Sequence, residues 1–211
     1  KRYVAVSTPE VYGATTKNIK ENHNYYPSTP YAASKLAGEL HLLALYKHYN
    51  FPVIFTRSVN LYGIHQQLYR IIPRTIIYLK LRKTIDLHGQ GKAMREFIHA
   101  RDVADLTLRA ILNGKIGDIY HFSPNDGLRS IADVVRLVCD LMNCKFDESV
   151  NLMNENFGQD SVYSLDASKA KSEFRWEQQV SFKDGIRETI KWIDANWEFI
   201  KNQPLEYIHK N

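Results

Sequence analysis

Two short apolar runs on either side of a long helix-forming segment constrain the fold of this chain more than any other feature. The runs Tyr3–Ser7 and Val53–Thr56 are rich in β-branched residues, which is typical of strands covered on both faces of a parallel sheet. Between them, residues 31–49 are strong helix formers with leucines at helical spacing, and Pro52 follows. A strand, a helix and a second strand in this order predict a right-handed βαβ crossover and an α/β fold.

The rest of the chain alternates helices with shorter strands. A third core strand is predicted over residues 118–122, and Ser130 and Ser181 are expected to cap two later helices. Further helices and short strands are predicted over 73–82, 84–87, 95–99, 102–112 and 167–174.

Composition and charge narrow the class of protein. Hydrophobic residues make up 44% of the chain, and 28 Lys and Arg are scattered among 23 Asp and Glu. This composition excludes disordered and collagen-like chains, and the absence of a basic stripe argues against a nucleic-acid partner. Cys139 and Cys144 form neither a CxxC metal pair nor a disulfide framework, and no HxxxH spacing indicates a metal site. Without an apolar run of roughly 20 residues we expect no membrane span, and we expect a cytoplasmic protein.

Polar motifs follow both predicted core strands, at the edge where open parallel sheets bind ligands. Ser7–Gly13 (STPEVYG) follows the first strand and Arg57–Gly63 (RSVNLYG) follows the second. Tyr31 and Lys35, four residues apart near a helix start, share one helical face. Because a lysine ammonium near a phenol favours the phenolate, Tyr31 is a candidate general base. The sequence therefore predicts a proton-transfer site at this edge of the sheet.

Thr8, Tyr31 and Lys35 resemble the Ser/Thr, Tyr, Lys set of the extended short-chain dehydrogenase/reductase family, and the 23-residue interval from Thr8 to Tyr31 fits that pattern. Within this family of NAD-dependent epimerases and dehydratases, the chain is most similar to nucleotide-sugar 4,6-dehydratases of the dTDP-glucose type. The matching segments run almost to the C-terminus and comprise residues 27–39, 57–63, 72–73, 88–91, 95–103, 117–120 and 185–190.

The resemblance implies a fold and a division into domains. Residues 1–60, with 91–122 returning to them, are expected to form the later half of a Rossmann-type parallel sheet, as the remainder of an NAD-binding domain with the catalytic residues. Residues 61–90 and 123–211 are expected to form mainly a smaller α/β substrate-binding domain. None of the 10 glycines forms the Gly-x-x-Gly-x-x-Gly cradle of the family. We therefore expect the cofactor-binding loop to lie outside this numbering, and the chain alone to be inactive.

Residue by residue, the resemblance implies oxidation and dehydration of a nucleotide-diphosphate hexose, with NAD as a recycled cofactor. Tyr31, supported by Lys35 and Thr8, takes the proton of the sugar 4-hydroxyl while hydride leaves C4 for NAD⁺. Glu10 then removes the C5 proton, water leaves from C6, and hydride returns to C6. Ser7, Tyr31 and Lys35 are the NAD contacts that the resemblance implies.

Pro9 departs from the dTDP-glucose type, in which an Asp at this position protonates the departing hydroxyl. Either Glu10 shuttles both protons, or the chain does not eliminate water. A 4,6-dehydratase is the preferred interpretation. The alternatives are a 4-epimerase, which needs Tyr31 but not Glu10, a UDP-glucuronate decarboxylase, and an inactive sugar-nucleotide-binding fragment.

Substrate contacts and a partner are also implied by the resemblance. Asn60 and Arg95 match family positions that contact the nucleotide diphosphate, whose oxygens a guanidinium binds in bidentate fashion. Asp160, the third implied substrate contact, lies in Gly158–Ser161, where the family has Gly-x-Asp-Arg. Because Ser161 replaces the arginine, the sequence does not indicate which nucleotide base is bound. The alternative role for Arg95 is a structural ion pair instead of a contact with the diphosphate. The helix over 31–49 joins a dimer interface in the family, and we expect a homodimer.

Overall fold

The computed structural model describes residues 1–14, 18–22, 24–154, 162 and 164–206. The chain divides into two compact units of three segments each. Unit 1 comprises Lys1–Leu61, Arg95–Leu128 and Asp160–Val180, and unit 2 comprises Tyr62–Met94, Arg129–Gln159 and Ser181–Asn211. We expected residues 123–211 mainly in the second part, whereas 123–128 and 160–180 cluster with unit 1. The binding roles expected for the two parts stay predictions.

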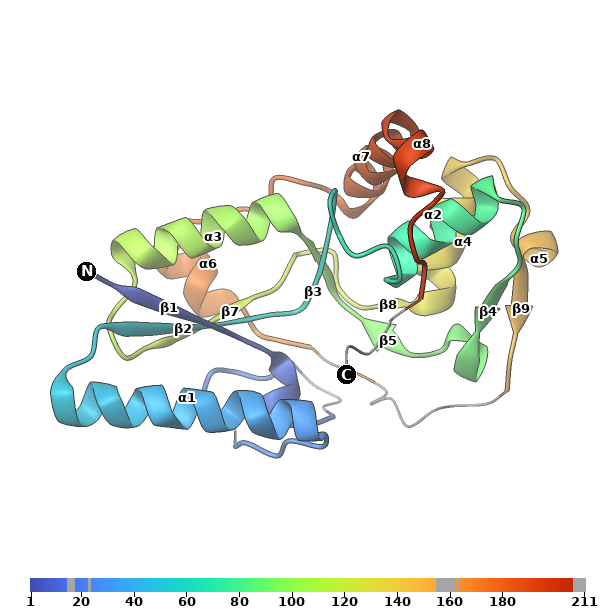
Figure 1. Cartoon of the computed structure of the whole chain (residues 1–211). Helices are drawn as coiled ribbons and strands as arrows, with labels where there is room; N and C mark the ends of the chain where they lie inside the picture. Colours follow the sequence, from blue (N-terminus) through green and yellow to red (C-terminus); the bar gives the residue numbers. More distant parts are fainter. Residues whose placement is uncertain (15–17, 23, 155–161, 163, 207–211) are drawn as a thin grey trace. The chain divides into compact units, whose positions relative to one another are not determined.

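Unit 1 is built around a three-stranded parallel sheet in the order β1-β2-β7 (Figure 1). Its strands are β1 (Tyr3–Ser7), β2 (Val53–Ser58) and β7 (Ile119–Phe122). The predicted parallel α/β class and all three core strands are therefore confirmed. The register of β1 against β2 ends at Ser7↔Arg57, so the two polar motifs leave the sheet at the same edge.

Helices cover both faces of this sheet. Helix α1 (Pro30–Tyr49) packs on one face, while α3 (Ala100–Asn113) and α6 (Ser168–Phe174) lie on the other (Figure 1). Side chains of β2 alternate between them, because Phe55 packs with leucines of α1 and Ile54 joins the cluster that includes Leu106 of α3. Burial on both faces is the physical reason for the unbroken apolar run in this strand.

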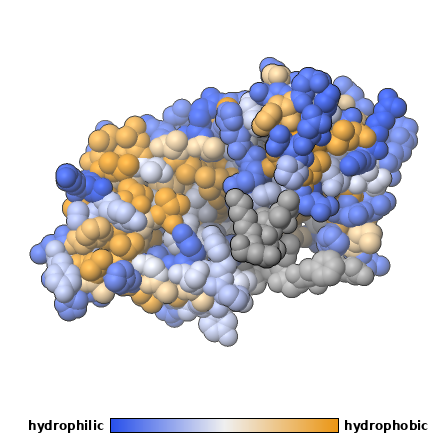
Figure 2. Space-filling view, in the orientation of Figure 1, coloured by the Kyte–Doolittle hydropathy of each residue, from blue (hydrophilic) through white to orange (hydrophobic). Residues whose placement is uncertain are grey.

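Among the described residues, no strand pairs with the outer edge of β1. Tyr3 and Val6 on β1 and Leu108 and Leu112 on α3 are exposed. Figure 2 shows apolar surface gathered over the part of the molecule in which these two elements lie. A free strand edge with apolar neighbours is a surface on which another strand is able to pair.

Short elements lie near points at which the chain passes between the two units. They are β3 (Asn60–Tyr62), β5 (Met94–Arg95), β6 (Phe97–His99) and β8 (Arg129–Ser130), while the short turn η1 (Pro9–Tyr12) follows β1. The single strand predicted over 95–99 is interrupted at Glu96, whose side chain is buried and hydrogen-bonded.

Unit 2 combines packed helices with a parallel pair of strands. The helices are α2 (Ile71–Lys80), α4 (Ile131–Leu141), α5 (Phe146–Ser149), α7 (Phe182–Ala195) and α8 (Trp197–Ile200). Strand β4 (Ile85–Leu87) pairs with β9 (Val150–Leu152), and the turn η2 (His88–Gly91) follows β4. Helix α2 packs against both α4 and α7.

Serine caps begin two of these helices as predicted. The Ser130 hydroxyl accepts from the Asp133 amide, and the Ser181 hydroxyl accepts from the Asp184 amide. Helix α2 begins at Ile71, two residues earlier than predicted, so Pro73 lies inside its first turn. No helix in the described part of the chain has the length and apolar character needed to cross a bilayer.

Two glycines of unit 1 are expected to respond in opposite ways to an added methyl group. Gly117 has φ 87°, and a Cβ there would overlap the Tyr46 ring, so Gly117→Ala is expected to lose at least about 1–3 kcal/mol of unfolding free energy. Gly38 lies on α1 with open space around it, so Gly38→Ala is expected to gain about 0.5–1 kcal/mol. Urea unfolding measures both variants. A loss in Gly38→Ala or a gain in Gly117→Ala would contradict this packing.

Candidate active site

The first group of predicted site residues lies where β1 ends. Thr8 caps the turn η1, and its buried hydroxyl accepts a hydrogen bond from the Glu10 amide at 3.3 Å. The same hydroxyl donates to the Glu10 carboxylate at 3.4 Å. Pro9 occupies the first position of the turn, where its fixed φ suits the helical backbone. The turn therefore holds the Glu10 carboxylate beside Thr8.

The second group comes from the start of α1. The Thr29 hydroxyl accepts from the Ala32 amide at 3.1 Å, and this cap places Tyr31 in the first turn. The Lys35 ammonium donates to the Val6 carbonyl at 2.8 Å, which ties α1 to the end of β1. Tyr31 is 55% exposed and lies one helical turn before Lys35. The structure therefore brings Lys35 to the strand end that leads into Thr8 and Glu10.

Two serine hydroxyls at neighbouring strand ends have no hydrogen-bond partner among the described residues. They belong to Ser7 at the end of β1 and Ser58 at the end of β2, and both oxygen atoms are buried. A buried hydroxyl without a partner costs about 1–3 kcal/mol, so such groups call for an explanation. Both hydroxyls lie at the same edge of the sheet as the first two groups, where the strands end.

The predicted substrate contacts Asn60 and Arg95 lie on adjoining segments of unit 1. The backbone amide of Asn60 donates to the backbone carbonyl of Glu96 at 3.2 Å, and the Asn60 side-chain amide donates to the same oxygen at 3.3 Å. Asn60 is thus anchored to the residue that follows the half-buried Arg95. Asp160, the third predicted substrate contact, lies outside the described residues.

A buried arginine that the sequence analysis did not single out organises this edge of the sheet. The Arg57 side chain has no exposed surface, and it donates to both carboxylate oxygens of Glu39 on α1. It also donates to the Tyr12 hydroxyl of η1 and, at 3.0 Å, to the Tyr25 hydroxyl. One guanidinium therefore links β2 with α1 and with the turn that carries Glu10.

The network extends from Tyr12 to the last strand of the sheet. The Tyr12 hydroxyl lies 2.8 Å from Nε2 of the buried His121 on β7. Burial, together with the nearby charge of Arg57, lowers the pKa of His121 to about 3. His121 is therefore neutral at pH 7, and its ring shares a hydrogen bond with the Tyr12 hydroxyl, which also accepts from Arg57 and lies 3.4 Å from the Glu21 carbonyl. Burial raises the pKa of Tyr12, so it stays protonated as well.

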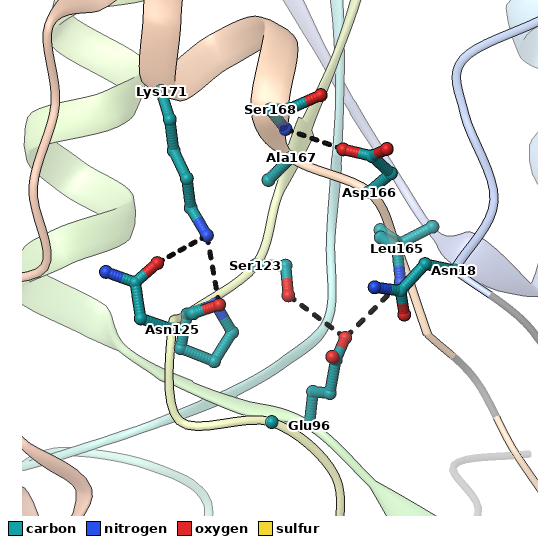
Figure 3. Close-up of a pocket in the computed structure, with 11 residues that line it drawn as sticks. Asn18, Glu96, Ser123, Asn125, Leu165, Asp166, Ala167, Ser168 and Lys171 are labelled. Carbon is teal, nitrogen blue, oxygen red and sulfur yellow. Dashed lines mark hydrogen bonds between the residues drawn. The ribbon is translucent and has the colours of Figure 1, made fainter.

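A polar cavity of about 280 Å³ lies elsewhere in unit 1 (Figure 3). Its floor is the Glu96 carboxylate, which accepts from the Ser123 hydroxyl at 3.0 Å and from the Leu165 amide at 3.3 Å. Burial raises the pKa of Glu96 and lowers the pKa of Lys171, which points at Asn125 from the opposite wall. None of the predicted catalytic residues lines this cavity.

Metal ligands are not clustered in the described part of the chain, where no group of three or more His, Cys, Asp or Glu side chains could hold an ion. The signals for the arginine network were present but weak. Arg57 ends a buried strand, and Glu39 follows Lys35 by one helical turn. His121 and Tyr25 had no such signal, because their contacts with Tyr12 and Arg57 join distant parts of the chain.

Comparisons with known proteins identify relatives of this chain. Residues 1–122 match the model of the NAD dependent epimerase/dehydratase family. Human dTDP-D-glucose 4,6-dehydratase is 33% identical over 208 residues, which cover 96% of this chain and 59% of the relative.

Two solved dTDP-glucose 4,6-dehydratases share the fold. The Bacillus anthracis enzyme, in complex with NAD, has a TM-score of 0.88 at 31% identity and covers 94% of this chain and 63% of its own. The Streptomyces venezuelae enzyme, with NAD bound, has a TM-score of 0.88 at 32% identity, with 94% and 61% covered. The chain spans less than two-thirds of the length of each of these relatives.

Removing one partner of the Arg57–Glu39 pair is expected to destabilise the fold more than removing both. Glu39→Met leaves an unpaired buried charge and is expected to lose about 3–5 kcal/mol, as is Arg57→Met, whereas the double variant is expected to lose less than either single variant. Urea unfolding measures all three. Additive losses would show that the two side chains act independently. Glu148→Gln, in an exposed ion pair, is the control and is expected to change little.

The neutral His121 is expected to make stability fall in acid. The unfolded chain binds a proton near pH 6.5, whereas the folded chain binds it only near pH 3. The stability contribution is therefore complete above pH 6.5 and is lost on acidification, by about 1.4 kcal/mol per pH unit. Urea unfolding at several pH values between 7 and 4, which lie between the two pKa values of His121 or close to the upper one, measures how the free energy of unfolding depends on pH. This dependence is expected to be shallower for His121→Gln than for the unchanged chain. Equal slopes would contradict the assignment.

Proposed function

Because this chain belongs to the NAD dependent epimerase/dehydratase family, we propose that it carries the catalytic residues of a nucleotide-sugar 4,6-dehydratase. In this reaction C4 of a nucleotide-diphosphate hexose is oxidised, water is eliminated across C5 and C6, and hydride returns to C6. The observation that carries the proposal is the arrangement at the end of β1. There Thr8 bonds to Glu10, and Lys35 bonds to the carbonyl before Ser7.

NAD is the proposed cofactor, and the residues present fit its reacting end. The buried Ser7 hydroxyl, which lacks a partner among the described residues, and the Lys35 ammonium are polar groups suited to its nicotinamide ribose. Bound NAD⁺ supplies a hydride acceptor for C4 and, after elimination, a hydride donor for C6. The chain has no Gly-x-x-Gly-x-x-Gly turn for the pyrophosphate, so the fit is limited to this end.

Tyr31 is the proposed base for the sugar 4-hydroxyl. It lies at the exposed start of α1, where a substrate is able to reach the phenol. Lys35 stabilises the phenolate by its positive charge, and Thr8 orients the hydroxyl by hydrogen bonding. The bond between Lys35 and Val6 fixes the ammonium on the side of the helix that faces the strand end.

Glu10 is the proposed acid and base of the elimination. Pro9 carries no ionisable group, so the position before Glu10 does not supply a separate acid. A carboxylate has two oxygens, and a proton taken from C5 is able to pass from the same group to the departing hydroxyl at C6. The hydrogen bond from Thr8 holds one of these oxygens at the strand end.

The substrate contacts and the partner are part of the same proposal. Asn60 and Arg95 would hold the diphosphate, supported by the bonds between Asn60 and Glu96. A second copy is the proposed partner, packing on α1, of which only Ala32 and Glu39 are buried and on which Leu40 is exposed. Analytical ultracentrifugation tests the dimer.

The assay uses the polypeptide as its source organism makes it, with NAD⁺ and a panel of nucleotide-diphosphate hexoses. The 4-keto-6-deoxy product is followed by its absorbance in alkali. Tyr31→Phe is expected to lower turnover by about 10²–10⁴-fold, because C4 is no longer oxidised. Glu10→Gln is expected to block the product while oxidation of C4 continues, which is visible as NADH that accumulates on the enzyme.

The outcomes separate the alternatives. A C4 epimer formed equally well by Glu10→Gln would replace the dehydratase with an epimerase. Carbon dioxide released from UDP-glucuronate would identify a decarboxylase. Binding of nucleotide sugars by calorimetry without turnover of any of them would identify a binding protein and overturn the proposal.

A further inference from the structure

The two cysteines of the chain, Cys139 and Cys144, lie at the end of α4 and are both free thiols. The Cys144 amide donates to the Cys139 carbonyl at 2.9 Å, and the Asn143 amide donates to the Asp140 carbonyl at 3.2 Å. Asn143 has φ 55°, in the left-handed region. These bonds define a Schellman motif, in which the residues at the two ends of the outer bond pack their side chains together. Cys139 and Cys144 occupy those ends.

Backbone geometry sets an upper limit on the separation of the two residues. The hydrogen bond of 2.9 Å and the covalent reach of each residue keep the two Cα atoms within about 6.8 Å. Disulfides span Cα separations of about 4.4–6.8 Å, so the motif keeps the pair within the longest separation that a disulfide bridges.

The environments of the two thiols differ. Cys139 is fully buried, and burial together with the neighbouring Cys144 raises its pKa to about 11. Cys144 is partly exposed, and its thiol contacts the Met142 carbonyl at 3.6 Å. A soluble oxidant therefore reaches Cys144 first, and Cys139 is reached only from within the protein.

We propose that Cys139 and Cys144 form a reversible disulfide, which makes the end of α4 an oxidation site of unit 2. The oxidant class is a low-molecular-weight disulfide such as glutathione disulfide. The Cys144 thiolate attacks one sulfur of it and releases one glutathione thiolate. The Cys139 thiolate then attacks the Cys144 sulfur and releases the second. Two protein thiols and one glutathione disulfide become one protein disulfide and two glutathione thiols.

The Cys139–Cys144 disulfide closes a ring that includes Asn143, and it locks the left-handed turn that ends α4. Helix α4 packs against α2 and is followed by α5, so oxidation fixes the connection between packed elements of unit 2. Because folding already holds the two residues together, the folded chain is expected to favour the disulfide more than the unfolded chain does.

The test equilibrates the chain with mixtures of reduced and oxidised glutathione, in buffer and in urea. After acid quenching, mass spectrometry detects the internal disulfide as a loss of the mass of two hydrogens. A peptide map then shows which two cysteines it joins. The equilibrium constant in buffer is expected to exceed that in urea by at least about tenfold, which is about 30 mV for a two-electron couple. Cys144→Ser is expected to remain fully reduced at Cys139.

Each result decides the proposal. An internal disulfide favoured by folding, absent in Cys144→Ser, supports it. Equal constants in buffer and urea would show that the fold does not bring the thiols together and would overturn it. Glutathione adducts on Cys144, or disulfides between two chains, as the only products would overturn it as well. Circular dichroism of Cys144→Ser confirms that the control is folded, and none of these readouts depends on catalytic activity.

Discussion

Arg57 carries a full charge at a position without exposed surface, and the edge of the sheet around it is arranged to satisfy that charge. Glu39 supplies the counter-charge from α1, and the Tyr12 and Tyr25 hydroxyls each accept a further hydrogen bond from the guanidinium. A buried charge without such partners costs several kcal/mol, so these elements are held in one arrangement. That arrangement positions both the turn after β1 and the helix that begins with the Tyr-x-x-x-Lys motif.

The candidate site is built on elements that this network holds. Thr8 and Glu10 share two hydrogen bonds, and Lys35 is tied to β1 through the Val6 carbonyl. The turn carrying Glu10 is also joined to β7 through Tyr12 and the neutral His121. A proton-transfer site needs its groups held at fixed positions, and the buried network beneath it provides that rigidity.

Local patterns predicted the core strands of unit 1 and the serine-capped helices of unit 2, and long-range contacts account for what they missed. Unbroken apolar runs identify strands covered on both faces, and serine caps identify helix starts, because both signals depend on neighbouring residues. The burial of Glu96 was not predicted, since its carboxylate is bonded to Ser123 and Leu165, which lie far along the chain. The same reason explains why the sequence did not reveal that α6 clusters with unit 1, where it packs on β7 and α3.

The sequence by itself determined the α/β class, the order of the strand, helix and strand, and which residues are candidates for the site, because periodicity and motif spacing are local properties. Only the tertiary structure decided that Arg57 is a buried hub and that His121 is neutral. It also decided that a backbone hydrogen bond at the end of α4 joins Cys144 to Cys139. These properties depend on burial and on partners distant in the chain or on the hydrogen bonds of a turn, and the amino-acid order alone does not reveal them.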